Sequence, residues 1–118
     1  MSAPLDSFAA AEAFALTLPG TERTTSYGKP AVGIAANGRA FLHCGGEADT
    51  SFVAAVDLET VELLKQTKPE TYWQSPHYEG WPAILIRYDS ADPERVRDVI
   101  REAYAQAAAK TKARKRKT

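Results

Sequence analysis

The sequence predicts an α+β fold in which an antiparallel sheet carries an N-terminal and a C-terminal helix on one face. Apolar residues recur at helical spacing near both ends of the chain, and short runs of strand-like residues lie between them. An Asn37-Gly38 dipeptide, of the kind that closes a hairpin, joins two of these runs. With 118 residues, 44% apolar and 25% charged, the chain has the size and composition of one folded domain.

The first helix is predicted over residues 6–18. Phe8, Ala11, Ala15 and Leu18 recur there at three- and four-residue steps, among alanines that favour helix. A proline and a glycine follow directly and should end this helix.

A hairpin is predicted next, with strands at about 31–36 and 39–44 joined by a two-residue type I′ turn at Asn37-Gly38. In that register Ile34 faces Phe41 and Val32 faces His43. Because strand side chains alternate, these four would share one face. The opposite face would carry Gly33, Leu42 and Cys44.

A third strand and a short helix follow. Residues 51–56 alternate so that Phe52, Ala54 and Val56 face one side. Asp57 is a good N-cap for a second helix, which Lys68 should end because it precedes a proline.

The last strands and the final helix complete the pattern. A short strand is predicted at residues 72–73, and residues 81–88 alternate as a longer one. Asp92-Pro93 supplies a cap and a first-turn proline for the final helix. Its apolar stripe consists of Val96, Val99, Ile100, Ala103, Tyr104 and Ala107.

The charge is unevenly distributed, although the 15 basic and 15 acidic residues give a formal net charge of zero. The end of the chain holds six basic residues: Lys110, Lys112, Arg114, Lys115, Arg116 and Lys117. Nine basic residues then stand against fifteen acidic ones, so the body is acidic, near −6. We expect a single domain at residues 1–109 and a disordered basic tail at residues 110–118.

Several kinds of protein are not expected. No signal-like segment and no apolar run of about 20 residues occurs, which predicts a cytoplasmic protein without membrane contact. Cys44 is the only cysteine, which excludes an internal disulfide. Neighbours on a strand, such as His43 and Cys44, point to opposite faces, so no metal site and no cofactor is expected.

The residue pattern also argues against an enzyme. Ser75 and His77 lie too close on a turn to act as nucleophile and base, and no third group completes a catalytic set. Gly45-Gly46 lacks the lysine and the helix start that a phosphate-binding loop needs. We therefore expect a non-enzymatic binding module. A monomer is favoured, but the sequence leaves the oligomeric state open.

Three parts of the chain carry a resemblance to a known family. The first combines Leu18-Pro19-Gly20 with residues 26–31, the second is residues 56–58, and the third is residues 75–83. The third part includes the run Pro-His-Tyr-Glu-Gly-Trp-Pro-Ala. There the chain resembles the MmcQ/YjbR family, over about residues 8–108. The resemblance implies a fold similar to bacterial CyaY and frataxin. It also implies DNA binding through hairpin wings, a role that carries over to Lys29 and Arg39.

The turn at residues 77–81 holds three candidate binding residues: His77, Tyr78 and Trp81. Their rings can stack on bases or form the wall of a pocket. Alternatively, Gly80 permits a tight turn and the aromatics cover the edge of the core.

Two functions are thus consistent with the sequence. The first is a DNA-binding module that contacts the phosphate backbone through Lys29, Arg39 and the tail cations, although ordinary surface charge also explains the first two. The alternative is a domain that binds a small ligand or a protein through the aromatic turn.

Overall fold

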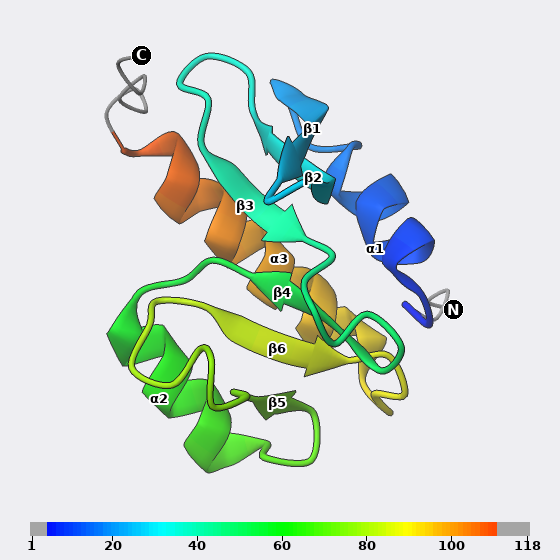
Figure 1. The fold of residues 1–118 in the computed structure, drawn as a ribbon, viewed down its shortest axis with the longest axis vertical. Coiled ribbons are helices and arrows are strands. Elements are labelled where there is room, and N and C mark those ends of the chain that lie inside the picture. The colour runs from blue at the N-terminus through cyan, green and yellow to red at the C-terminus, as the bar shows by residue number, and fades with distance from the viewer. Residues whose placement is uncertain (1–4, 111–118) are drawn as a thin grey trace.

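The structure, a computed structural model, describes residues 5–110 of the chain. The described part contains nine regular elements in the order shown in Figure 1. They are α1 (Phe8–Ala15), β1 (Thr21–Ser26), β2 (Lys29–Ile34), β3 (Ala40–His43), β4 (Ser51–Ala54), α2 (Leu58–Thr67), β5 (Tyr72–Trp73), β6 (Ile84–Arg87) and α3 (Pro93–Ala108).

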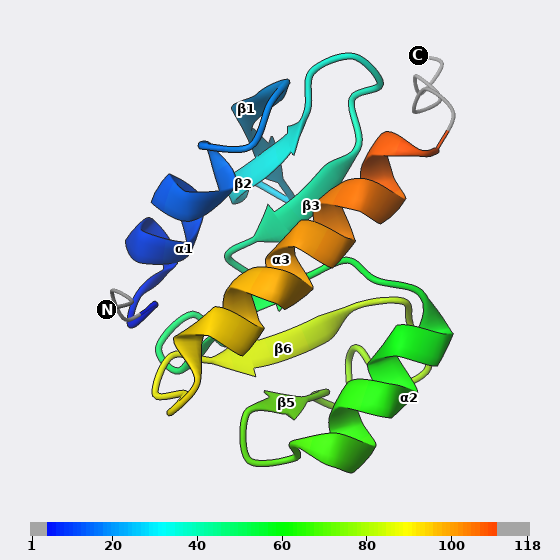
Figure 2. The same ribbon diagram turned by 180° about the vertical axis from the view of Figure 1, so that it is seen from behind.

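The strands form one sheet in the order β1-β2-β3-β4-β6-β5, and all neighbours are antiparallel. Figure 2 shows α3 lying across one face of the sheet, and Figure 1 shows the opposite face toward the viewer. The main core cluster joins buried residues of all three helices to one face of the sheet. The predicted α+β fold, with N- and C-terminal helices on one face, is confirmed.

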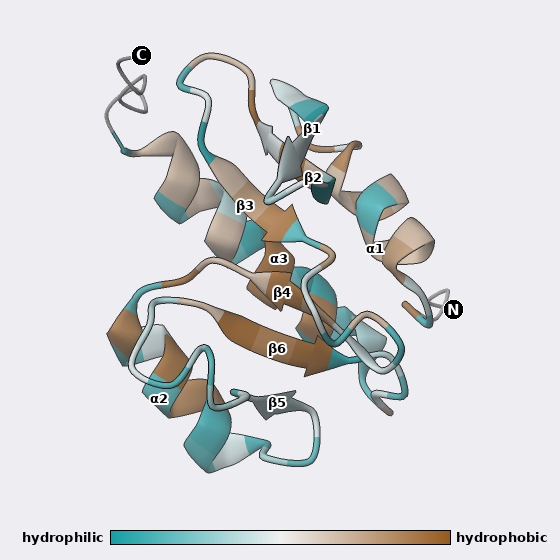
Figure 3. Cartoon of the chain, viewed as in Figure 1, coloured by the Kyte–Doolittle hydropathy of each residue, from teal (hydrophilic) through white to brown (hydrophobic). Residues whose placement is uncertain are grey.

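The opposite face of the sheet, called the open face here, has a smaller apolar cluster. Val53, Ala83 and Leu85 are buried there, and Trp73 and Tyr78 pack against them. Figure 3 shows that the hydrophobic residues of the sheet concentrate on β3, β4 and β6, whereas β1 is hydrophilic. The centre of the open face is therefore apolar.

Side-chain caps begin all three described helices. Ser7, Asp57 and Asp92 each accept a hydrogen bond from the amide three residues further on. The predicted positions of α2 and α3 are confirmed, while α1 is shorter than residues 6–18 because its cap is Ser7 and it ends at Ala15. Within residues 5–110, no helix has both the length and the apolar character needed to cross a membrane.

Strand β1 was not predicted from the sequence. Its residues, Thr-Glu-Arg-Thr-Thr-Ser, are polar throughout, and the middle four are exposed. The strand lies at the edge of the sheet, where pairing with β2 alone holds it. An edge strand that buries neither face has no alternation of apolar residues by which it can be found.

The turn that joins β2 to β3 is longer than the predicted two residues at Asn37-Gly38. The amide of Ile34 donates to the carbonyl of Arg39, so residues 35–38 form the connecting loop. Two successive residues with positive φ, the mark of a type I′ turn, occur instead at Tyr27-Gly28 between β1 and β2, with φ of 53° and 77°.

The pairing of β2 with β3 differs from the prediction accordingly. Leu42 pairs with Val32 and His43 with Ala31, and an irregularity at Phe41 absorbs one residue as a β-bulge. Because cross-strand partners share a face, His43 lies on the open face while Leu42 joins Val32 in the core. Two predicted pairs are wrong: Val32 with His43 and Ile34 with Phe41.

Asn37 ties this loop to the end of α3. Its buried side chain donates from Nδ2 to the carbonyls of Ala107, at 2.8 Å, and Lys110, at 3.1 Å. Its Oδ1 accepts from the amide of Arg39 at 3.0 Å. One amide thus satisfies carbonyls at the helix C-terminus and closes the loop as well.

Candidate functional site

Five aromatic side chains gather on the open face and form a recess that we call the aromatic cleft: Tyr27, His43, His77, Tyr78 and Trp81. Two adjoining pockets of about 220 and 250 Å³ share its first four residues. The residues come from the β1–β2 turn, the end of β3 and the loop at residues 74–83. Segments far apart in the sequence therefore supply one concave aromatic surface.

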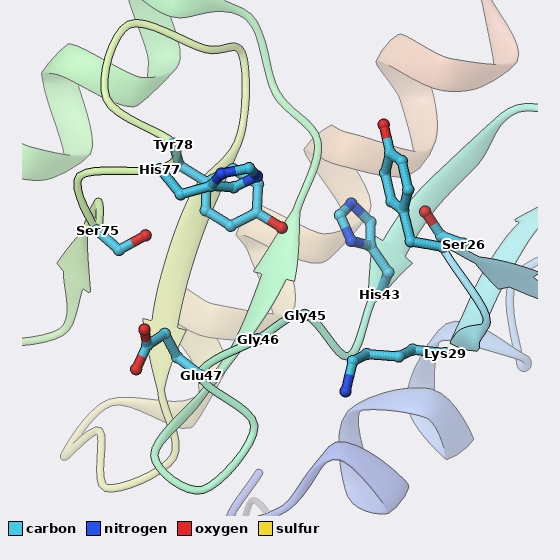
Figure 4. A pocket seen from close by; sticks show the side chains of 10 residues that line it. Ser26, Lys29, His43, Gly45, Gly46, Glu47, Ser75, His77 and Tyr78 are labelled. Carbon is cyan, nitrogen blue, oxygen red and sulfur yellow. The ribbon is translucent and has the colours of Figure 1, made fainter.

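A polar rim surrounds part of the cleft. Figure 4 shows His77 and Tyr78 on one side and His43 and Lys29 across from them, with Glu47 at the edge. Gly45 forms part of the wall, with φ of 75°, and a Cβ there would lie 2.6 Å from Cγ2 of Val53. The wall thus requires glycine at this position.

The outer rings are those of Tyr27, with 97% of its surface exposed, and Trp81, with 63% exposed. Tyr27 has φ of 53°, the left-handed region that aromatic residues rarely adopt. Such a conformation costs about 1–3 kcal/mol and often marks a functional position. The chain thus holds a large, solvent-exposed ring in a backbone conformation that glycine or asparagine would adopt more easily.

Replacing Tyr27 with asparagine is expected to raise the free energy of unfolding by about 1 kcal/mol, because asparagine tolerates positive φ. Little burial is lost, since the ring is exposed. Urea unfolding measures the change, and Tyr27→Phe, which keeps the strain, serves as the control with unchanged stability. Equal stability of the asparagine and phenylalanine variants would show that the turn is not strained.

Gln74 holds the loop that carries His77, Tyr78 and Trp81. Its Nε2 lies 3.0 Å from the carbonyls of Tyr78 and Trp81 and 2.7 Å from that of Ala83. Its Oε1 accepts from Nζ of Lys65 at 3.0 Å. Gln74 is therefore a positioning residue for the whole turn.

Two inner side chains of the cleft, those of His43 and Tyr78, are kept in their uncharged forms by burial. Burial lowers the pKa of His43 below its ordinary value, because the imidazolium would lose its hydration. Burial, and secondarily the nearby Tyr27 phenol, raises the pKa of Tyr78. A neutral imidazole and a protonated phenol suit contact with a neutral ring better than with a phosphate.

The candidate residues fall into two groups in space. His77, Tyr78 and Trp81 line the aromatic cleft, and Lys29 lies at its rim. Arg39 lies beyond the other end of β2. It follows the loop in which the side chain of Asn37 donates to the Lys110 carbonyl. Lys29 and Arg39 thus do not form one wing. The remaining tail candidates lie outside the described residues: Lys112, Arg114, Lys115, Arg116 and Lys117.

Two nearby aromatics are not part of the cleft. Tyr72 is buried in the main core. Trp73 packs on the open face, where its Nε1 donates to Oγ of Ser51 at 3.0 Å and the Arg87 guanidinium lies 4.6 Å from its ring. Neither ring therefore contributes to the aromatic cleft.

Two cleft residues were missed as candidates in the sequence. Tyr27 is not among the residues predicted from the sequence, although the glycine after it is a signal for a turn. His43 was assigned to the same face as Val32, a consequence of the wrong register. Within residues 5–110, no group of three or more His, Cys, Asp or Glu side chains is placed to hold a metal ion.

Comparisons with known proteins agree with the fold. A family model described as YjbR matches residues 16–106. The crystal structure of Deinococcus radiodurans protein DR2400, which carries the family-model domain DUF419, is similar with a TM-score of 0.74 and 16% sequence identity. The similarity covers 93% of this chain and 84% of that one. No curated protein matches the chain.

Proposed function

The chain belongs to the YjbR family, and from the cleft that its fold presents we propose a non-enzymatic module that binds single-stranded DNA by stacking bases on aromatic rings. The observation that carries this proposal is the exposure of Tyr27 and Trp81 at the rim of a cleft with three further rings. Stacking on an aromatic side chain contributes about 1–3 kcal/mol per base.

A single strand fits this site better than a duplex. Bases in a duplex are already stacked on one another, whereas unpaired bases are free to enter a cleft. Lys29 at the rim supplies one phosphate contact beside the neutral rings. The acidic body of the domain would repel the longer backbone of a duplex on average.

Arg39 and Lys110, near the other end of β2, would add phosphate contacts, and the basic residues that follow Lys110 in the sequence would add more. These contacts carry no sequence information, so they would raise affinity for any strand. The protein would act in the cytoplasm, where such strands occur.

Binding without catalysis is part of the proposal. Ser75 hydrogen-bonds neither His43 nor His77 in the described part of the chain, so no activated nucleophile supports a reaction there. A second candidate is a free planar small molecule, which the modest pocket volumes of about 220 and 250 Å³ favour. Both candidates use the same rings, and only the DNA candidate involves phosphates.

Fluorescence anisotropy of a labelled single-stranded oligothymidylate, with a duplex of equal length beside it, tests the proposal. Trp81→Ala is expected to weaken single-strand binding by about five- to 150-fold, the range that a loss of about 1–3 kcal/mol implies. Leu63→Ala, which removes an exposed apolar side chain from α2, is the matched control and should bind normally.

A salt titration separates the two candidates. The logarithm of the binding constant should fall against the logarithm of salt with a slope of about −0.7 for each neutralised phosphate. A chain that ends at Lys110 keeps the Asn37 contact and should show a flatter slope. Binding that disappears with this truncation, or that Trp81→Ala leaves unchanged, would rule out a DNA site in the cleft.

A further inference from the structure

A second pocket lies where the α2–β5 connection meets the start of α3. Its volume is about 190 Å³, and its lining includes Lys68, Tyr72, Asp89, Asp92 and Arg95. It shares no residue with the aromatic cleft. We call it the α3 pocket.

Tyr72 contributes a buried polar atom to this pocket. Only 2% of the residue is exposed, and its hydroxyl has no hydrogen-bond partner among the described residues. Tyr72 lines the pocket together with Arg95 and Asp92, and the charges of these two side chains also act on the phenol. Burial raises the pKa of Tyr72 to about 12, so the hydroxyl keeps a proton that it can donate.

A buried hydroxyl without a partner costs about 1–3 kcal/mol. The strands around Tyr72 are well packed, and the residue itself belongs to the main core. An unpaired donor in such a place indicates that a polar group from outside the chain pairs with it.

Two charged side chains of the α3 pocket also lack partners in the described part of the chain: Asp89 and Arg95. The other charges are engaged. Lys68 Nζ lies 3.6 Å from Glu70 Oε2, and Asp92 Oδ1 accepts from the Arg95 amide at 3.1 Å. The pocket therefore offers one guanidinium and one carboxylate.

We propose that the α3 pocket binds a small zwitterion of the α-amino-acid type. Its carboxylate would accept from the Tyr72 hydroxyl and the Arg95 guanidinium, and its ammonium group would pair with Asp89. A simple anion would meet the negative charge of Asp89, and a simple cation would meet Arg95. Only a ligand with both charges matches both side chains.

The location supports the carboxylate end of the proposal. The pocket opens at the N-terminus of the 16-residue helix α3, where the helix dipole favours negative charge. A volume of about 190 Å³ exceeds what one water needs and accommodates a molecule of a few heavy atoms.

Titration of the ¹⁵N-labelled full chain with glycine, followed by amide NMR shifts, tests the proposal. Glycine should shift the amides at residues 71–72 and 89–95 with saturation. Acetate and methylammonium chloride, at matched ionic strength, should produce at least fivefold weaker binding. Equal binding of acetate and glycine would overturn the assignment of a zwitterion.

Tyr72→Phe supplies the decisive variant, because removal of an unpartnered hydroxyl leaves the fold intact. It should weaken glycine binding at least fivefold, while Tyr88→Phe, in a half-buried tyrosine outside the pocket, should not. Glycine that shifts no amide near the pocket, or that binds Tyr72→Phe as well as the parent chain, would mean that water alone satisfies the hydroxyl.

Discussion

Replacing Gln74 with leucine is expected to reduce single-strand binding by more than tenfold and the free energy of unfolding by about 2–3 kcal/mol, since each lost hydrogen bond contributes about 0.5–1.5 kcal/mol. The carbonyls of Tyr78, Trp81 and Ala83 share the two N–H groups of Nε2 and lose this common donor at once, while the first two keep their backbone donors. The rings of His77, Tyr78 and Trp81 then lose their common position.

Gln74→Glu tests the same contact with an isosteric side chain. The carboxylate would keep the Lys65 contact and would turn an oxygen toward the three carbonyls, so it should be at least as damaging as leucine. Gln66→Leu, on the exposed side of α2, is the control. Urea unfolding and anisotropy measure both effects, and normal binding by Gln74→Leu would show that the loop is fixed by other contacts.

Replacing Asn37 with alanine is expected to lower the free energy of unfolding by about 2–4 kcal/mol, because three backbone groups lose their hydrogen bond to its buried side chain, and each such bond contributes about 0.5–1.5 kcal/mol. These groups are the carbonyls of Ala107 and Lys110 and the amide of Arg39. A shift of roughly 4–8 °C in Tm per kcal/mol makes the loss easy to detect by thermal unfolding.

Asn37→Asp separates the two halves of this contact. The carboxylate keeps the acceptor for Arg39 but loses the donor to the helix carbonyls, and it adds a negative charge at a helix C-terminus. It should therefore destabilise as much as alanine does. A Tm close to that of the parent chain would show that the donor contributes little.

The helices and central strands were predictable because their signals are local. Asp57 and Asp92 cap the helices that follow them, and Ile84 and Ile86 alternate with Leu85 along β6 as predicted. A cap and an alternation each lie within a few residues, so their reading needs no tertiary information.

The register of β2 and β3 was not predictable in the same way. The loop between them is fixed by Asn37, whose partners Ala107 and Lys110 lie 70 and 73 residues away. Asn37-Gly38 has the composition of a tight turn, but this distant contact competes with it. The resulting bulge turns His43 to the open face.

Part of the aromatic cleft could be predicted from the sequence. The aromatic turn at residues 77–81 was recognisable because its rings are neighbours in sequence. Tyr27 and His43 reach the same cleft only through the β1–β2 turn and the bulge. The predicted wing of Lys29 and Arg39 separated because these residues lie at opposite ends of β2.

The bond from Asn37 to the Lys110 carbonyl also fixes the place at which the described part of the chain ends. Strand β2 lies between that place and Lys29 at the cleft. Because a strand rises about 3.3 Å per residue, its length separates the two by roughly 17 Å. A strand of DNA held in the cleft would thus raise the effective concentration of its own phosphates near the basic segment that follows. Two individually weak contacts would then combine into bivalent binding. An oligonucleotide shorter than the span between the two contacts would lose this gain in avidity.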